Sequence, residues 1–347
     1  MEPNTFIVGA YATSPNLYGA EHPDEGIAYD AEQEARFYSG LAAVPAVGGL
    51  EVQFDGKMHA DEALFLSELA RPQWRGVLTC IGGTMARIGA DPAFGLASTD
   101  EAGRAAALEF AREACDAVAR WNARPGAAAA GGRMVAVEIH SAPNTTKAPS
   151  GSSAEAFGRS LTELSRWDWH GAQLVVEHCD AATPANTAPS KGFLPLDQEI
   201  EAVQQAGADA GIGVAVNWAR STIEARDGGA TAATHIDRAA RSGLLRAVMF
   251  SGCTGVAGPY GPWRDCHMPH APTDGVEYAV EGSLMDAAAM RASAAARGDA
   301  ALLYTGCKIT SLNSGRWVGA DPDDVDTRVG LNRDCVAQVA AAMQIQQ

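Results

Sequence analysis

Short apolar runs rich in β-branched residues recur eight times along the chain, and each is followed by a polar or glycine-rich stretch and then by a segment with helical periodicity. Right-handed crossovers between parallel strands close naturally into a barrel when there are eight such units. The eight runs are Phe6–Tyr11, Leu50–Phe54, Gly76–Ile81, Met134–His140, Gln173–His178, Ile212–Trp218, Leu245–Phe250 and Ala301–Tyr304.

Helical periodicity follows the runs, and one further helical segment closes the chain. The order of elements predicts an α/β fold, with a single (β/α)8 TIM-barrel domain over residues 1–347. A doubly wound open sheet is disfavoured because the turn after the first run lacks the glycines that a dinucleotide pyrophosphate needs. The expected helices are Ala31–Ala42, Ala60–Ala70, Asp100–Asn122, Ser153–Ser165, Leu196–Ala208, Ser221–Arg241, Ser283–Ala296 and Val325–Met343.

One connection is much longer than the others. The segment Ser251–Gly282, after the seventh run, is rich in glycine and proline. Loops of this length inside a compact domain are usually functional. We therefore expect an extended loop after strand seven that acts as a lid or substrate collar.

Charge and cysteine usage restrict the partners and the compartment. The chain has 26 basic and 42 acidic side chains, for a formal net charge of −16, which disfavours nucleic acids and anionic membranes as partners. Its 7 cysteines are scattered singly, and the first apolar run is too short for a signal sequence. These features predict a cytoplasmic protein with a small-molecule partner, and they leave a homo-oligomer open.

Polar residues gather where the predicted strands end. In a TIM barrel the carboxyl ends of the strands carry the chemistry, so these residues are the candidates for the site. They are Glu51, Glu138, His140, Glu177, Asn217, Trp218, Arg220 and Lys308 at the strand ends, with Trp263, Arg264, Asp265 and His267 in the loop after strand seven.

Strand alternation sorts some of these candidates. Glu138 and His140 share one side of their strand, whereas the adjacent Glu177 and His178 must face opposite sides, so one of that pair is structural. Burying an unpaired carboxylate is costly. We therefore expect Glu177 to point into the site, where it is paired, metal-bound or catalytic.

The fourth and fifth runs, VEIHSAP and VVEHCDA, resemble strands of the xylose-isomerase-like barrels, a superfamily of sugar and sugar-phosphate isomerases and epimerases. The resemblance implies a divalent cation held by residues on strands five to eight. Glu177 matches the first of these ligands. Asn217, Ser251 and Lys308 stand at the places of the other three, and they offer a hard cation far less negative charge.

Two hypotheses follow for the charge at the centre. The Lys308 ammonium could occupy the space of the lost cation, pair with Glu177 and polarise a substrate oxygen, with a structural salt bridge as the alternative. A metal could instead use Glu177, Asp265, His267 and His140. No cofactor is required by the sequence, and one ion of Mn, Zn or Mg is left open, with Glu177 and His267 as tentative ligands.

These considerations predict an isomerase or epimerase of a sugar, with an anionic sugar or sugar phosphate favoured because Arg220 and Arg264 suit a phosphate or carboxylate. Glu177, His140, Lys308 and His267 are the predicted catalytic residues. The other candidates would bind substrate, with Trp218 and Trp263 stacking on the sugar or else serving as packing residues. A lyase or hydrolase on modified sugars and a non-catalytic sugar-binding barrel are the alternatives. The predicted substrate-binding residues are Glu51, Glu138, Asn217, Trp218, Arg220, Trp263, Arg264 and Asp265.

Overall fold

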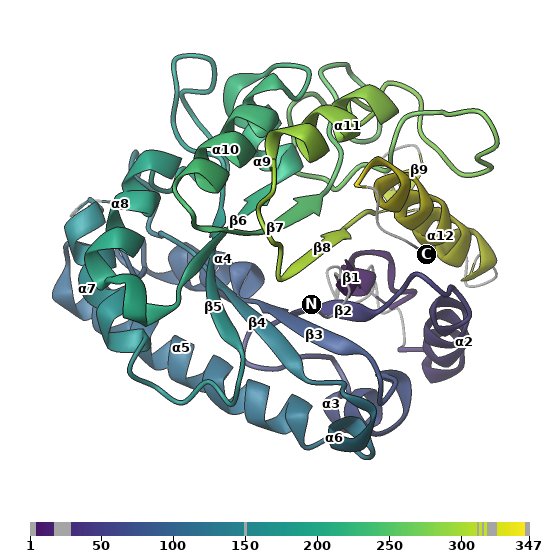
Figure 1. The fold of residues 1–347 in the computed structure, drawn as a ribbon, viewed down its shortest axis with the longest axis horizontal. Helices are drawn as coiled ribbons and strands as arrows, with labels where there is room; N and C mark the ends of the chain where they lie inside the picture. Colours follow the sequence, from purple (N-terminus) through teal and green to yellow (C-terminus); the bar gives the residue numbers. More distant parts are fainter. Residues whose placement is uncertain are drawn as a thin grey trace.

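A computed structural model describes residues 5–16, 29–148, 151–310, 312–313, 316–317 and 325–343 of the chain. Eight parallel strands follow one another in sequence order around a closed barrel, in which β1 pairs with both β2 and β8. Helices surround the strands on the outside (Figure 1). The predicted (β/α)8 TIM barrel is therefore confirmed.

The strands of the barrel are short, from 4 to 6 residues each, and most of their residues are buried on both faces. Parallel strands covered by helices have this character, which explains their near-continuous apolar sequences. The strands are β1 (Thr5–Val8), β2 (Gly49–Gln53), β3 (Arg75–Thr79), β4 (Met134–Ile139), β5 (Gln173–His178), β6 (Gly213–Asn217), β7 (Leu245–Phe250) and β8 (Tyr304–Cys307). A separate antiparallel pair joins β9 (Leu312–Asn313) to β10 (Arg316–Trp317).

Several helices begin at a side chain that accepts a hydrogen bond from a free backbone N–H, as at Asp100, which accepts from the Gly103 amide at 2.9 Å. Such a cap stabilises a helix by about 1 kcal/mol. The α-helices are α2 (Ala31–Ala42), α3 (Glu62–Leu64), α4 (Ile81–Ala90), α5 (Glu101–Asn122), α6 (Ala127–Ala130), α7 (Ala154–Leu164), α8 (Leu196–Ala206), α9 (Trp218–Ala225), α10 (Ala230–Arg241), α11 (Ala287–Ala296) and α12 (Val325–Ala342). Other helical turns are η1 (Ala10–Thr13), η3 (Phe65–Leu69) and η4 (Ala208–Ala210).

Two sequence-based expectations need correction, and one helix was not predicted. The last strand is β8 (Tyr304–Cys307), displaced from the predicted Ala301–Tyr304, because the apolar run leads into the strand and the less apolar TGC segment forms most of it. The predicted helix Ser221–Arg241 is two helices, since Arg226 and Gly229 adopt left-handed backbone angles between α9 and α10. Helix α4, directly after β3, was not predicted.

The strands separate two apolar cores. The side chains inside the barrel form a small cluster, and the outward side chains pack with the helices into a much larger one. On β5, Val175 lies in the inner cluster and Val176 in the outer cluster, as alternation requires. The inner cluster consists of Ile7, Val77, Ala136, Val175, Ala215, Ala247, Met249 and Tyr304. Polar inward-facing residues are therefore left to the carboxyl ends of the strands.

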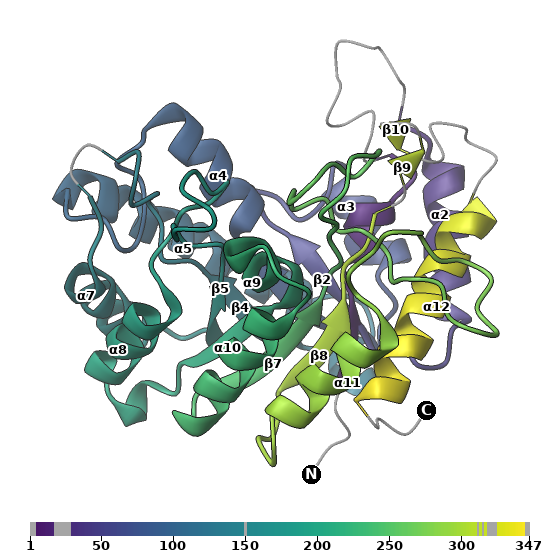
Figure 2. The same cartoon turned by 90° about the horizontal axis from the view of Figure 1, so that it is seen from above.

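The ring of helices closes where α12 packs against α2, α11 and β8 (Figures 1 and 2). The expected long connection after β7 is present and extends from Ser251 to α11, with no helix inside it. Its Gly252 and Met268 form an isolated antiparallel bridge. This connection carries several of the predicted site residues.

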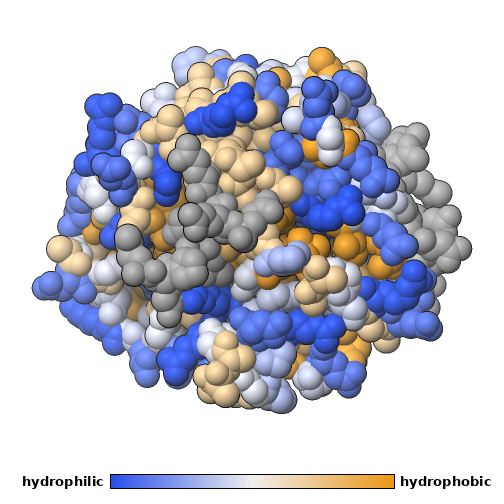
Figure 3. Space-filling view, turned by 45° about the vertical axis from the view of Figure 1, so that its right-hand side comes forward, coloured by the Kyte–Doolittle hydropathy of each residue, from blue (hydrophilic) through white to orange (hydrophobic). Residues whose placement is uncertain are grey.

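Hydrophilic residues ring the face of the molecule seen in Figure 3, with apolar residues in patches between them. Among the described residues, the exposed large hydrophobic side chains are Tyr29 and Val256. None of the helices that the structure describes is both long and apolar enough to span a membrane.

Candidate active site

Three glutamates point into the barrel at the carboxyl ends of β2, β4 and β5. Glu138 and Glu177 each follow an inner-core residue by two positions, so alternation turns them inward, and Glu51 lies level with the inward-facing Val77. None of the three is more than 1% exposed. One carboxylate oxygen from each lies within 4.8 Å of the other two. Carboxylates this close cannot all ionise unless positive charge compensates them.

Lys308, directly after β8, supplies positive charge to this group. Its Nζ lies 2.9 Å from Oε1 of Glu51, and both side chains are fully buried. The register pairs Cys307 with Val8 and Val8 with Leu50. The next residues, Lys308 and Glu51, therefore meet at the same level across β1.

Gly9 allows this contact. A Cβ atom at Gly9 would lie 2.7 Å from Oε2 of Glu51 and 2.8 Å from Cβ of Lys308, so a larger residue would displace the ion pair. The predicted pairing of Lys308 with Glu177 is wrong, because the strand register places Lys308 beside Glu51, with which it forms its ion pair. Burial opposes the charge on Lys308, but Glu51 raises the pKa of its ammonium well above the ordinary value.

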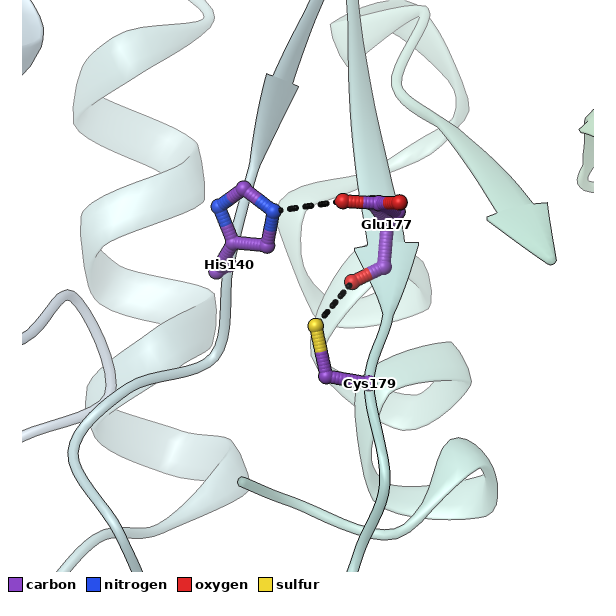
Figure 4. A group of neighbouring side chains, drawn as sticks. All are labelled: His140, Glu177 and Cys179. Carbon is purple, nitrogen blue, oxygen red and sulfur yellow. Dashed lines mark hydrogen bonds and ion pairs between the residues drawn. The ribbon is translucent and has the colours of Figure 1, made fainter. Parts of the chain in front are cut away.

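Glu177 has its own set of partners. His140 Nε2 lies 2.8 Å from Oε2 (Figure 4), Arg220 Nη1 lies 2.7 Å from the same oxygen, and Asn217 Nδ2 donates to Oε1 at 3.0 Å. Burial alone would raise the pKa of Glu177, but the charges of Arg220 and Lys308 hold it well below its usual range. Burial lowers the pKa of His140, although Glu177 opposes that shift. Glu177 is thus an ionised carboxylate beside a neutral imidazole.

Glu138 is the opposite case. The Tyr304 hydroxyl donates to its Oε1 at 2.5 Å. Burial, followed by the charges of Glu177 and Glu51, raises the pKa of Glu138 well above its ordinary value. Within the described part of the chain, Oε2 of Glu138 and Oε2 of Glu51 lack a hydrogen-bond partner. The surroundings of these two neighbouring glutamates therefore shift their pKa values in opposite directions.

Asp265, in the loop after β7, extends the network on the side of Arg220. Its Oδ2 lies 2.6 Å from Lys191 Nζ and 3.0 Å from Arg220 Nε. Burial would raise the pKa of Asp265, but Lys191 and Arg220 hold it well below its usual range. Arg220 is 1% exposed and is already paired with two carboxylates. Its predicted role as a receptor for a substrate anion therefore loses support.

His267 lies at the edge of the same network, with a backbone φ of +53° in the left-handed region. Its Nδ1 is 2.8 Å from the Ser251 hydroxyl and 3.3 Å from Oδ1 of Asp265. Because both groups approach the same nitrogen, the imidazole cannot link them as the histidine of a Ser-His-Asp triad does. Burial lowers the pKa of His267 to about 3, despite the neighbouring Asp265.

The structure places Trp218 outside the site, and the predicted substrate contacts of Trp263 and Arg264 stay predictions. Trp218 is fully buried, and its Nε1 donates to Ser293 Oγ on α11 at 3.1 Å, so it packs among helices and not in the site. This follows from alternation, since its neighbour Asn217 faces inward. Trp263 is half-buried, and Arg264 is exposed beside it.

A pocket of about 300 Å³ opens beside β1 and β2, within the size range of small-molecule sites. Tyr11 lines it, and the Tyr11 ring centroid is 5.8 Å from Lys308 Nζ. Gln53, two residues beyond Glu51 on the same face of β2, also lines it. Sequence reasoning missed Tyr11, Gln53 and Tyr304. They could have been identified because each lies just after a strand or at a strand position whose side chain alternation directs into the barrel.

The residues present discriminate between possible metal sites. At the position typical of the resembling superfamily, Asn217 donates to Glu177 and caps α9, and Ser251 binds His267, so that site does not fit an ion. The alternative set predicted from the sequence was Glu177, Asp265, His267 and His140. The charge of Asp265 is already neutralised by Lys191 and Arg220. The third residue within ligand distance of His140 and Glu177 is Cys179. The carboxylates of Glu51, Glu138 and Glu177 do fit a hard divalent cation, because two of their buried oxygens lack partners.

A family model described as "Domain of unknown function (DUF4862)" matches residues 7–328. The chain belongs to the DUF4862 family. The match covers the barrel from Ile7 to the first residues of α12, and it includes each of the buried residues described above.

Other similarities of this DUF4862 protein support the same extent and fold. It is 34% identical over 343 residues to "Uncharacterized protein STM3670" of Salmonella typhimurium, which covers 99% of both chains. Among solved structures, a chain from the crystal structure of AsfvAP:AG matches with a TM-score of 0.51 at 8% identity, covering 98% of this chain and 99% of that one. The probable 3-DHS dehydratase AsbF of Bacillus anthracis has a TM-score of 0.45 at 8% identity, with 94% and 97% covered. At 8% identity the likeness to the first of these structures concerns the fold alone, and the second, with its lower TM-score, adds no argument.

Proposed function

We propose that the protein is a sugar isomerase or epimerase that works by proton transfer at the carboxyl end of the barrel. The observation that carries this proposal is the contrast between two neighbouring buried glutamates. Glu177 lies against a guanidinium, an imidazole and an amide, which lower its pKa, whereas Glu138 lies against the Tyr304 hydroxyl with its Oε2 unpartnered, and burial beside two other glutamates raises its pKa. Pairs of carboxyl groups whose environments separate their pKa values divide into a general base and a general acid. An isomerase that moves a proton between adjacent carbons needs one of each.

In this mechanism Glu177 removes a proton from the carbon next to a substrate carbonyl, and the electron pair of that C–H bond forms an enediolate. Glu138 protonates the carbonyl oxygen, which gives the enediol, and Glu138 becomes the carboxylate. Glu177 then returns its proton to the neighbouring carbon while Glu138 takes the proton of the other enediol hydroxyl, which forms the isomeric carbonyl and restores both carboxyl groups. The Lys308 ammonium stabilises the negative oxygen of the intermediate. His140, through Nε2, positions Glu177, and His267 lies on the loop side of the same network.

A divalent cation such as Mg²⁺ or Mn²⁺ would be held by Glu51, Glu138 and Glu177 in place of the Glu138 proton, so a protein with the cation bound would not use Glu138 as the acid. When bound, it would polarise a substrate carbonyl as a Lewis acid. Lys308 supplies one positive charge at this place through its own side chain.

The pocket beside β1 and β2 supports a polyhydroxylated substrate, because Tyr11 and Tyr29 offer ring faces and Asn16, Gln53 and Asp55 offer hydrogen-bonding groups. An anionic sugar remains part of the proposal only through exposed groups such as Arg264, since Arg220 is committed to Glu177 and Asp265.

The test is hydrogen exchange in D₂O with a panel of five- and six-carbon aldoses and ketoses, followed by NMR. We expect the wild-type protein to introduce deuterium at the carbon next to the carbonyl and to form the isomer. Glu177→Gln should lower exchange by about 10²–10⁴-fold, as loss of a general base does. Glu138→Gln keeps a neutral side chain of the same shape, and it should lower product formation more than exchange.

Glu163→Gln is the matched control, because the Glu163 side chain is 47% exposed and lies on α7, away from the site. It should behave as wild type. A wild-type protein that binds a sugar from the panel but exchanges no hydrogen would establish a binding barrel instead. Unsaturated products would point to a lyase and cleaved glycosides to a hydrolase, and either would overturn the proposal.

A further inference from the structure

A second cluster of ligating side chains lies outside the barrel, where β5 faces the helices. Its members are His178 at the end of β5, Glu224 on α9 and His235 on α10. One ligand atom from each lies within 4.8 Å of the other two. The cluster is separate from the candidate active site, because strand alternation directs His178 away from Glu177.

A carboxylate orients His178 from behind. Oε2 of Glu199 lies 2.7 Å from His178 Nδ1, and the Ser141 hydroxyl donates to the other oxygen of Glu199 at 2.5 Å. Histidines that bind metals almost always donate their second ring N–H to such a partner. This arrangement leaves Nε2 of His178 as the atom that faces Glu224 and His235.

His235 is oriented in the same way. Its Nδ1 lies 3.0 Å from the Ser221 hydroxyl, which leaves Nε2 directed at Glu224. That Nε2 is 3.9 Å from Oε1 of Glu224, which is beyond hydrogen-bond distance. The His235 side chain is 14% exposed, so the cluster lies close to solvent on the side of α10.

The pair His178 and Glu224 has the spacing of ligands on a tetrahedral ion, and His235 lies somewhat farther away, with its Nε2 3.9 Å from Oε1 of Glu224. Bonds of about 2.0–2.1 Å from zinc to nitrogen or oxygen place neighbouring ligand atoms of a tetrahedron about 3.3 Å apart. His178 Nε2 and Glu224 Oε2 are 3.1 Å apart, and the imidazoles of His178 and His235 meet edge to face with centroids 4.8 Å apart. The Ala181 amide also donates to Oε2 of Glu224 at 2.9 Å and holds the carboxylate in place.

We propose that His178, Glu224 and His235 bind a zinc ion, with Glu199 and Ser221 orienting the two imidazoles. Two nitrogens and one carboxylate oxygen, with a fourth position left to water, form a ligand set that zinc accepts. Zinc displaces the proton that otherwise joins His178 Nε2 to Glu224. The ion fastens α9 and α10 to the end of β5, outside the barrel.

The full chain is first stripped of metal with EDTA. It is then titrated with Zn²⁺ in competition with a chromophoric chelator. A separate titration with Co²⁺ is followed by visible absorption. We expect one zinc equivalent that is lost in His235→Ala, and intense cobalt bands of tetrahedral coordination in the wild type alone. His235→Ala keeps the contacts of His178 with Glu199 and Glu224, so it should fold, and circular dichroism checks this. Ser221→Ala should weaken binding about 10–100-fold, the usual effect of losing an orienting partner.

His170→Ala is the control for histidine removal, because the His170 side chain is 40% exposed and lies outside the cluster. It should bind zinc as the wild type does. Glu177→Gln should also keep the equivalent that depends on His235, which separates this site from the carboxylates inside the barrel. Wild-type zinc stoichiometry and affinity in His235→Ala, or no zinc bound by the wild type, would overturn the proposal.

Discussion

Two adjacent residues of β5 belong to very different surroundings. Glu177 points into the barrel and His178 points out to the helices, and both are fully buried. Inside, Oε2 of Glu51 and Oε2 of Glu138 have no partner among the residues described, whereas outside, each ring nitrogen of His178 lies within 3.1 Å of a carboxylate. Burial of charge therefore does not distinguish the two regions. The balance of hydrogen-bond partners does, because the inner carboxylates keep two oxygens without a partner, whereas the outer histidine is held between two carboxylates when no metal is bound.

The histidines of the two regions differ in the same way. Burial would lower the pKa of His178, but Glu199 and Glu224 raise it to about 10, so the side chain is an imidazolium between two carboxylates. The inner His267 has a pKa of about 3 because burial dominates over Asp265. A charged histidine thus cross-links the helices outside, and a neutral histidine lines the network inside.

Removing His178 should give the largest change in stability. His178→Ala leaves Glu199 and Glu224 facing one another, and breaking a buried ion pair in this way costs about 3–5 kcal/mol. Denaturant unfolding with a chelator present measures the effect. Folded His178→Ala should still exchange substrate hydrogen at the wild-type rate, since its side chain lies outside the barrel. The exposed His170→Ala should change stability by less than about 0.5 kcal/mol, and an equal loss in both variants would remove the distinction.

The neutral state of His267 predicts a smaller effect on the acid side. Its pKa falls from an ordinary value near 6.5 in the unfolded chain to about 3 in the folded protein, so unfolding takes up a proton below pH 6.5. The stability that follows is present above pH 6.5 and is lost as the pH falls toward 3. Between pH 6.5 and 5 the wild type should lose about 2 kcal/mol more than His267→Asn, which does not titrate. Equal slopes for the two proteins would show that folding does not change the pKa of His267.

The sequence predicted the barrel well because its strands repeat a simple pattern. β5 and β7 have the predicted bounds, and the opposite orientation of Glu177 and His178 follows from alternation alone. β8 was displaced because the run ALLY is more apolar than the TGC segment that forms most of the strand. Glycine is required at position 306 because a Cβ there would lie 2.0 Å from the Ile7 carbonyl oxygen. The hydrophobic pattern of the sequence does not reveal this contact.

The pairing within the site was less predictable. Lys308 meets Glu51 because the register places residues of β8 and β2 at one level across β1, and the absence of a side chain at Gly9 leaves room between them. Register and shear are properties of the closed barrel, and eight short runs do not specify them. The same holds for Lys191, which reaches Asp265 from 74 residues away in the chain.

The smallest predicted effect concerns Trp218, which follows the inward Asn217 but belongs to the outer region. Trp218→Phe keeps an aromatic ring among α9, α10 and α11 and removes the hydrogen bond from Nε1 to Ser293 Oγ. Loss of one such bond should lower the free energy of unfolding by about 1 kcal/mol. Hydrogen exchange into a sugar substrate and its KM should stay at the wild-type values, because the indole does not reach the inside of the barrel. A raised KM without loss of stability would instead place Trp218 at the substrate. It would mean that the direction in which a side chain points at the end of a strand, into the barrel or toward the helices, does not decide whether its role is functional or structural.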